Sequence, residues 1–188
     1  EQYQAEDAWT WEHQALVRAR AVAGDPDLCQ RVESLRRTLL GRARDPDELA
    51  REVVRMRRRM REHAGVKPHA AEMDVKQGFG GIVDIEFMVQ YAVLAWAHRE
   101  PALADWSDNV RILDTLARSG LLPESRCRAL NDAYLDLRSA THRLALQQKA
   151  AKVQPESVQE HRQAVLDAWS SFFGDTEREL TASPDEPS

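Results

Sequence analysis

Apolar residues recur every three or four positions along most of this 188-residue chain, and almost no stretch alternates with a period of two. A spacing of three and four marks one face of an α-helix, whereas a half-buried strand alternates. The pattern therefore predicts an all-α fold, a bundle of about seven helices. We expect these helices at 7–22, across 28–39, from 46 past 60, at 82–97, between 107 and 120, from 123 past 144, and at 155–173.

Three of these helices have clear apolar stripes. The stripes are Leu28, Val32, Leu35 and Leu39 in the second, Leu49, Val53, Met56 and Met60 in the third, and Cys127, Leu130, Tyr134, Leu137, Thr141 and Leu144 in the sixth. The third helix also has a complete start signal, because Asp45 can act as N-cap, Pro46 suits the first helical position and Glu48 can close a capping box. Ser107 is the expected N-cap of the fifth helix. We expect all of these stripes to face the core.

One glycine-rich loop interrupts the helical pattern between 65 and 81. Pro68 and the glycines at 78, 80 and 81 mark it as a loop, with room for a short extended piece at 73–75. The stretch that follows, 82–97, is apolar nearly all round, which is typical of a helix at the centre of a bundle. The loop therefore leads directly into the expected buried helix.

The chain divides into three parts by pattern. Residues 1–24 hold the first helix, 25–175 form the bundle, and 176–188 are a polar, proline-containing tail that we expect to be disordered. The sequence opens on Glu without Met, and Trp9 and Trp11 follow almost at once. We expect more protein upstream, with these tryptophans at a domain interface.

Composition and spacing exclude several functions. The net charge of −5 disfavours a nucleic-acid partner, and no apolar run reaches the length of a membrane span. The two cysteines have no CxxC spacing, so we expect no disulfide framework. The six histidines do not occur at the i, i+3 or i, i+4 spacing with which one helix binds a metal ion, so we expect no metal site. No Walker A loop, HExxH, GxSxG or magnesium-binding aspartate pair is present. We therefore expect no catalytic residue in this chain, and a cytoplasmic location.

The loop offers one candidate ligand site. Gly80 and Gly81 precede the buried helix, where free backbone N–H groups favour an anion, and Lys76 could add positive charge. The alternative, which we favour, is that the glycines only let the loop pack closely against the start of the helix, near which Asp84 places its carboxylate. Phosphate binding needs more than glycines.

Three polar residues lie within the apolar helix: Asp84, Glu86 and Gln90. Buried carboxylates need cationic partners. The candidates are Arg18, Arg20, Arg111, Arg138 and Arg143. At 100° per residue, Asp84 and Glu86 point about 200° apart, so they cannot bind one metal together. We expect them to hold neighbouring helices together.

Five arginines crowd the third helix, at 55, 57, 58, 59 and 61. They straddle the stripe at Met56 and Met60, so we expect them to cover its outer surface and pair with acids such as Glu52 and Glu62. Two alternatives are a docking surface for an acidic partner or for nucleotide phosphates, and a nucleic-acid surface.

Several stretches, in this order along the chain, resemble the glutamine synthetase adenylyltransferases. They are Ala8-Trp9-Thr10-Trp11-Glu12-His13-Gln14-Ala15-Leu16-Val17-Arg18-Ala19-Arg20, the Glu-Val-x-x-Met-Arg-x-Arg-Met-Arg pattern at 52–61, Asp74-Val75-Lys76 through Gly80-Gly81-Ile82-Val83-Asp84-Ile85-Glu86-Phe87, Trp106-Ser107-Asp108-Asn109-Val110-Arg111-Ile112-Leu113, Ala133 to Arg138, and His142 to Gln147. The first is similar to the segment that follows the nucleotidyltransferase core, and the glycine-containing stretch also has a relative in PII uridylyltransferases. The Trp9 and Trp106 stretches resemble the C-terminal half, which attaches AMP.

The resemblance implies a parent enzyme that uses ATP and Mg²⁺ to transfer AMP to a tyrosine of glutamine synthetase. Glutamine and the PII signal protein would set the direction, and the catalytic acids would lie upstream. This chain would then support an upstream nucleotidyltransferase domain through Trp9, Trp11, Glu12, Arg18 and Arg20, without ATP or Mg²⁺ of its own. The alternative is a stand-alone helical module that binds glutamine synthetase or PII.

Overall fold

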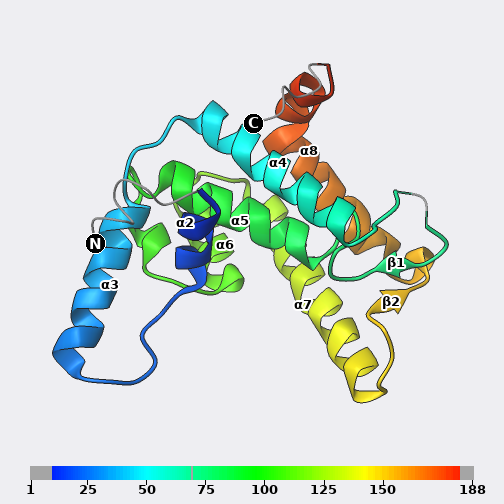
Figure 1. Ribbon diagram of the computed structural model, residues 1–188, viewed down its shortest axis with the longest axis horizontal. Helices are drawn as coiled ribbons and strands as arrows, with labels where there is room; N and C mark the ends of the chain where they lie inside the picture. Colours follow the sequence, from blue (N-terminus) through cyan, green and yellow to red (C-terminus); the bar gives the residue numbers. More distant parts are fainter. Residues whose placement is uncertain (1–9, 69, 183–188) are drawn as a thin grey trace.

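The computed structural model describes residues 10–68 and 70–182 and confirms the all-α fold (Figure 1). The elements run α2 (Thr10–Arg18), α3 (Pro26–Leu40), α4 (Pro46–His63), β1 (Met73–Asp74), α5 (Ile82–Trp96), the 3₁₀ turn η1 (Pro101–Ala104), α6 (Asn109–Arg118), α7 (Glu124–Leu146), β2 (Lys152–Val153), the 3₁₀ turn η2 (Pro155–Val158) and α8 (Gln159–Ala182). The described residues thus hold seven α-helices, as expected. None of these helices is long and apolar enough to cross a membrane.

Helix α5 is the centre of the bundle, as its all-round apolar sequence predicts. It packs against α2, α4, α6, α7 and α8, and twelve of its fifteen residues are buried. Toward its C-terminal end, Tyr91 meets Phe172 and Phe173 of α8 edge to face, with ring centroids 6.0 and 5.0 Å apart. The central helix is therefore held by a close-packed apolar surround.

Helix α4 begins where its sequence predicts, but a different face is buried. The Asp45 carboxylate accepts hydrogen bonds from the backbone N–H groups of Asp47 and Glu48. Leu49 and Val53 are in the core, whereas the expected stripe residues Met56 and Met60 are only half-buried. The inward positions of its second half belong instead to Arg57 and Arg61.

Helix α3 does not bury its apolar stripe, contrary to the prediction. Leu39 is in the core, but Leu28 is 57% exposed and Val32 is 47% exposed. The main contacts of α3 are with α2 and η1 only, and it lies at one end of the molecule (Figure 1). Its N-terminal half therefore extends beyond the bundle.

Two arginines attach α3 to the rest of the fold. Arg36 donates to the carbonyl oxygens of Leu16, Val17, Ala104 and Trp106 at 2.6–2.9 Å. Arg44 donates to Leu39 O at 2.9 Å, and more weakly to Leu94 O at 3.4 Å. Burial lowers the pKa of both guanidiniums. Each arginine thus adds hydrogen bonds to carbonyl oxygens near the ends of helices, where the backbone leaves acceptors incompletely used.

Several expected boundaries are corrected. Helix α2 ends at Arg18 rather than 22, and Asp108 rather than Ser107 caps α6 by accepting from the N–H of Arg111. Helix α8 continues to Ala182, past the predicted end at 173 and into the segment predicted to be a disordered tail. Its residue Leu180 is buried, which explains the extension. Residues 183–188 lie outside the described part.

A small antiparallel ribbon joins the glycine-rich loop to the segment before α8. Met73 pairs with Val153 and Asp74 with Lys152. An extended piece at 73–75 was predicted, but its partner strand was not. The ribbon places the loop beside the N-terminal end of α8 (Figure 1).

Candidate functional site

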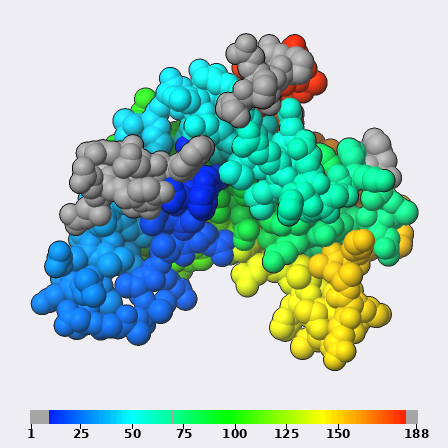
Figure 2. Space-filling view, in the orientation of Figure 1, coloured from blue at the N-terminus to red at the C-terminus, as the bar shows by residue number. Residues whose placement is uncertain are grey.

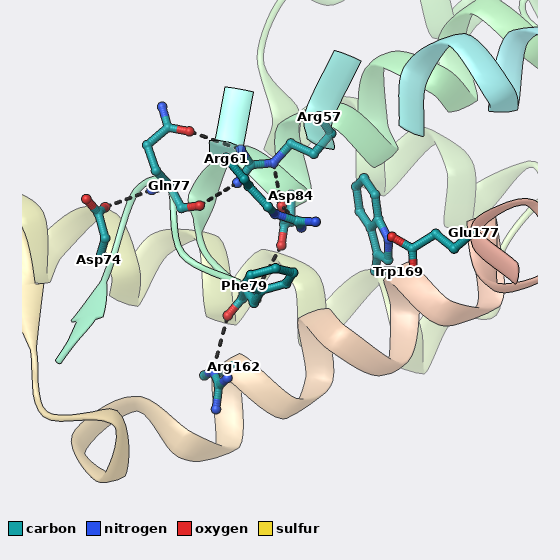
Figure 3. Close-up of polar contacts among 10 residues, drawn as sticks. Arg57, Arg61, Asp74, Gln77, Phe79, Asp84, Arg162, Trp169 and Glu177 are labelled. Carbon is teal, nitrogen blue, oxygen red and sulfur yellow. Dashed lines mark hydrogen bonds and ion pairs between the residues drawn. The ribbon is translucent and has the colours of Figure 1, made fainter. Parts of the chain in front are cut away.

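A buried cluster of charged side chains links α4, the glycine-rich loop and α5 (Figure 3). The Asp84 carboxylate is fully buried, and its Oδ1 accepts from Arg57 Nε and from Arg61 Nη2, each at 2.7 Å. Its Oδ2 accepts from the backbone N–H of Gly80 at 2.8 Å. One carboxylate thus connects two helices and the loop between them.

The loop's backbone is shaped to present this N–H group. The Asp74 carboxylate accepts from the N–H groups of Lys76 and Gln77, and Gly81 N–H donates to Gly78 O at 3.0 Å. Gly80 has φ +78°, and a Cβ there would lie 2.7 Å from Cγ and the carbonyl oxygen of Arg162. Glycine is required at this position by both backbone conformation and space.

Arg57 also binds the loop directly. Its Nη1 donates to Gln77 Oε1 at 3.0 Å and its Nη2 to Gln77 O at 2.8 Å. Burial lowers the pKa of Arg57, the adjacent Asp84 carboxylate opposes that shift, and neighbouring Arg61 adds to it. The guanidinium therefore depends on Asp84 for its charge compensation.

Aromatic rings cover the second guanidinium. Arg61 Cζ lies 4.1 Å from the ring centroid of Phe79 and 5.2 Å from that of Trp169, which suits cation–π attraction (Figure 3). Arg162 of α8 in turn donates to Phe79 O at 3.1 Å, and Trp169 Nε1 donates to Glu177. The cluster thus extends from α4 to α8.

The chemistry of this cluster is structural. A guanidinium stays protonated at any physiological pH, so the two arginines cannot exchange protons with a substrate. Among residues 10–68 and 70–182, no group of three His, Cys, Asp or Glu side chains is placed to hold a metal ion. The arrangement fixes the loop and the start of α5.

The proposed anion site at the loop uses its N–H groups internally. Gly80 donates to Asp84 and Gly81 to Gly78, while the side chain of Lys76 lies in an exposed position. The negative charge at the start of α5 is therefore the protein's own Asp84 carboxylate. The two glycines also pack closely, because a Cβ at Gly80 would lie 2.7 Å from Arg162 and one at Gly81 2.8 Å from Val75 O.

The partners of the two carboxylates in α5 differ from each other, as their 200° separation predicts. Glu86 pairs with Arg18 of α2 at 3.0 Å, which was one of the expected partners. Asp84 pairs with Arg57 and Arg61, which were not. Gln90 accepts from Gln14 Nε2 of α2 at 3.1 Å.

The arginine cluster of α4 is therefore not wholly an outer surface, contrary to the prediction. Arg57 is fully buried and Arg61 is 7% exposed. A signal for this was present in the sequence: both continue the four-residue spacing from Val53, and an aspartate occupies the first turn of the buried helix. Arg59 is exposed, and Arg58 is half-buried.

The interface candidates of the first helix differ in exposure. Trp11 is 50% exposed, Arg20 is exposed, and Arg18 remains partly exposed while it pairs with Glu86. Glu12 is half-buried, and Trp9 lies outside the described residues. An exposed tryptophan beside arginines has the composition of a contact surface.

Two family models match the chain. Residues 47–169 match the model described as GlnD PII-uridylyltransferase, and residues 1–35 match that of glutamate-ammonia ligase adenylyltransferase. The first match covers α4 to the middle of α8 and includes Asp84 with its partners Arg57, Arg61 and Gly80. The second covers α2 and the larger part of α3.

Proposed function

Because the chain belongs to the GlnD PII-uridylyltransferase family and is a helical domain of the glutamine synthetase adenylyltransferase type, we propose that it supports adenylyl transfer by an upstream domain. In this proposal, the upstream nucleotidyltransferase domain holds Mg²⁺ and ATP and transfers AMP to a tyrosine of glutamine synthetase. The helical domain positions that domain and contributes no catalytic residue.

The observation that carries the proposal is the attachment of α2 to the bundle. The stretch that matches the adenylyltransferase model is held by Arg36, which binds the carbonyl oxygens of Leu16 and Val17 at the end of α2. Arg18 and Gln14 add side-chain contacts to α5. A domain joined to α2 would therefore be held firmly relative to the bundle.

We infer from the resemblance that the domain belongs to the half that attaches AMP, and Arg36 joins the two stretches that carry this resemblance. Two stretches resemble that half, one around Trp11 and one beginning at Trp106. Arg36 contacts both, since it binds Leu16 O in the first and Trp106 O in the second. Arg111 lies over the Trp106 ring at 4.5 Å, which fixes the second stretch further. The two similar stretches thus form one contact region.

The test is transfer of radiolabelled AMP from ATP to purified glutamine synthetase. We expect no transfer by this chain alone and clear transfer when it is joined to its native upstream region. Within the joined protein, Arg36→Met should reduce transfer, whereas Arg37→Met should not, because Arg37 is exposed and pairs with Asp105 at the surface.

Each other result has a distinct meaning. Transfer by the chain alone would place a catalytic site within it and refute the supporting role. Absence of transfer from the joined protein would favour the stand-alone module, which binds glutamine synthetase or PII without chemistry. Thermal melting of both arginine variants separates loss of positioning from loss of folding.

A further inference from the structure

Residues 19–25 connect α2 to α3, and we call this segment the link. An apolar groove lies between the link and α3. It has a volume of about 490 Å³ and is lined mainly by apolar side chains, among them Val22, Leu28, Val32 and Leu35. Four of the six exposed large apolar side chains of the described residues lie within 11–32. Such a concentration marks an interaction surface rather than ordinary surface composition.

The groove is held in shape by local hydrogen bonds. Glu33 of α3 accepts from the N–H of Ala21 in the link at 2.9 Å, and Asp25 caps α3 by accepting from Leu28 N–H. Gly24 has φ +131°, a backbone conformation that lets the link turn into the helix. The groove is therefore preformed, which lowers the entropic cost of filling it.

We propose that this groove receives an apolar segment of the upstream nucleotidyltransferase domain, an inference that rests on the proposed function. Eleven of the thirteen residues lining the groove lie within 1–35, the stretch that matches the adenylyltransferase model. None lies within 47–169, the stretch that matches the uridylyltransferase model. The groove thus lies mainly in the stretch matched by the adenylyltransferase model, which favours an occupant that belongs to that enzyme over a partner common to both families.

Tethering also favours the upstream domain over a second copy of this chain. Helix α2 packs on α3, so a domain joined to α2 is held near the groove. A short linker gives an effective concentration of the order of millimolar, above that of a free second copy in most solutions. The segment that fits carries two or three branched aliphatic or aromatic side chains, with a carboxylate to meet Arg20 on the groove wall.

Cys29 provides a direct probe, because it lines the groove, whereas the chain's other cysteine, Cys127, is buried. In the joined protein, maleimide labelling of Cys29 is followed by mass spectrometry of its peptide. We expect Val32→Asp to expel the segment and to speed labelling of Cys29 about tenfold, since a closed face reacts only when it opens. The matched control, Leu146→Asp, changes an apolar residue that is 73% exposed at the end of α7 and should leave the rate unchanged.

A second variant, Val22→Asp in the link, tests the same face from its other side and guards against a local effect on α3. Equal labelling of Cys29 in wild-type and both variant proteins would overturn the proposal. Protection that depends on protein concentration would also overturn it and assign the groove to a second copy. AMP transfer measured on the same samples distinguishes the docking of a segment in the groove from the supporting role of the domain. Protected Cys29 without AMP transfer refutes only the supporting role. AMP transfer with unprotected Cys29 refutes only the docking.

Discussion

Replacing Asp84 by Asn tests whether the buried ion cluster holds the glycine-rich loop in place. The asparagine has nearly the same shape, so the change removes charge with little change in volume. The carboxylate accepts hydrogen bonds from two guanidiniums and from the backbone N–H of Gly80, and it is fully buried. An amide oxygen in place of Oδ1 can still accept from both guanidiniums, but an amide NH2 in place of Oδ2 cannot accept from Gly80 N–H, and the neutral amide cannot compensate two positive charges.

The expected magnitude follows from the burial of Arg57 and Arg61. Arg57 is fully buried and Arg61 is 7% exposed, so neither can recover its hydration without opening the loop. Removing one partner of a buried ion pair typically costs about 3–5 kcal/mol. For a domain of this size that corresponds to a fall of roughly 6–20 °C in melting temperature.

Glu86→Gln is the matched control, because Glu86 lies on the same helix but in a partly exposed ion pair. Its side chain is 26% exposed and that of its partner Arg18 is 38% exposed. Exposed ion pairs contribute about 0–1 kcal/mol. The two isosteric substitutions therefore differ mainly in burial, and the predicted difference between them is at least about 2 kcal/mol.

Urea unfolding followed by circular dichroism measures both variants on one scale. Hydrogen exchange of the amide of Gly80 adds a local measurement, because that N–H group should exchange faster in the Asp84→Asn protein. A loss of less than about 1 kcal/mol for Asp84→Asn, equal to that of Glu86→Gln, would refute the argument that the carboxylate compensates two buried cations.

Three further variants test other elements of the fold by urea unfolding or thermal melts. Arg36→Met should lower the free energy of unfolding by about 3 kcal/mol or more, because it leaves buried carbonyl oxygens without partners. Arg37→Met should lower it by less than about 1 kcal/mol. Equal losses would refute the role of Arg36 in binding these carbonyl oxygens. Gly80→Ala should cost about 1–3 kcal/mol more than Gly120→Ala, because both glycines have positive φ but only the first Cβ would meet α8. The Asp45 carboxylate accepts hydrogen bonds from the backbone N–H groups of Glu48 and, with a smaller effect, of Asp47. These bonds lower the pKa of Asp45 below its usual 3.8. The lowered pKa stabilises the folded protein at pH values above 3.8, and this stabilisation is lost as the pH falls through the lower pKa of the folded state. Asp45→Ala should therefore destabilise the protein at neutral pH and match wild type in strong acid. A difference in stability that does not change with pH would contradict this.

The sequence predicts the helices and the central position of α5 because local spacing decides them. Fifteen consecutive positions with few polar residues leave no face for solvent, so 82–96 has to be surrounded. The Asp45 cap was equally predictable, since its partners lie two and three residues away. Features that depend on neighbours in sequence need no knowledge of the tertiary structure.

The partners of Asp84 required tertiary information that spacing does not contain. Arg57 and Arg61 look like members of a solvated run because their neighbours Arg55, Arg58 and Arg59 share their charge. What places two of the five inward is the register of α4 against α5, which depends on packing at Val53 and Val54. The Val153 pairing of the ribbon is similar, because it joins segments eighty residues apart.

The exposed stripe of α3 differs from these cases, because its pattern is that of a buried helix although its N-terminal half lies outside the core. Leu28, Val32 and Leu35 have the spacing of a helix face that packs against another surface. A face that contacts only solvent does not require three aligned apolar side chains. The two mismatches between pattern and burial therefore have opposite origins. The buried arginines of α4 are compensated within the bundle, by Asp84 and by aromatic rings, and need no partner from outside. The apolar residues of α3 have no such compensation within the described chain, and the docking of an upstream segment is the arrangement that would account for their spacing.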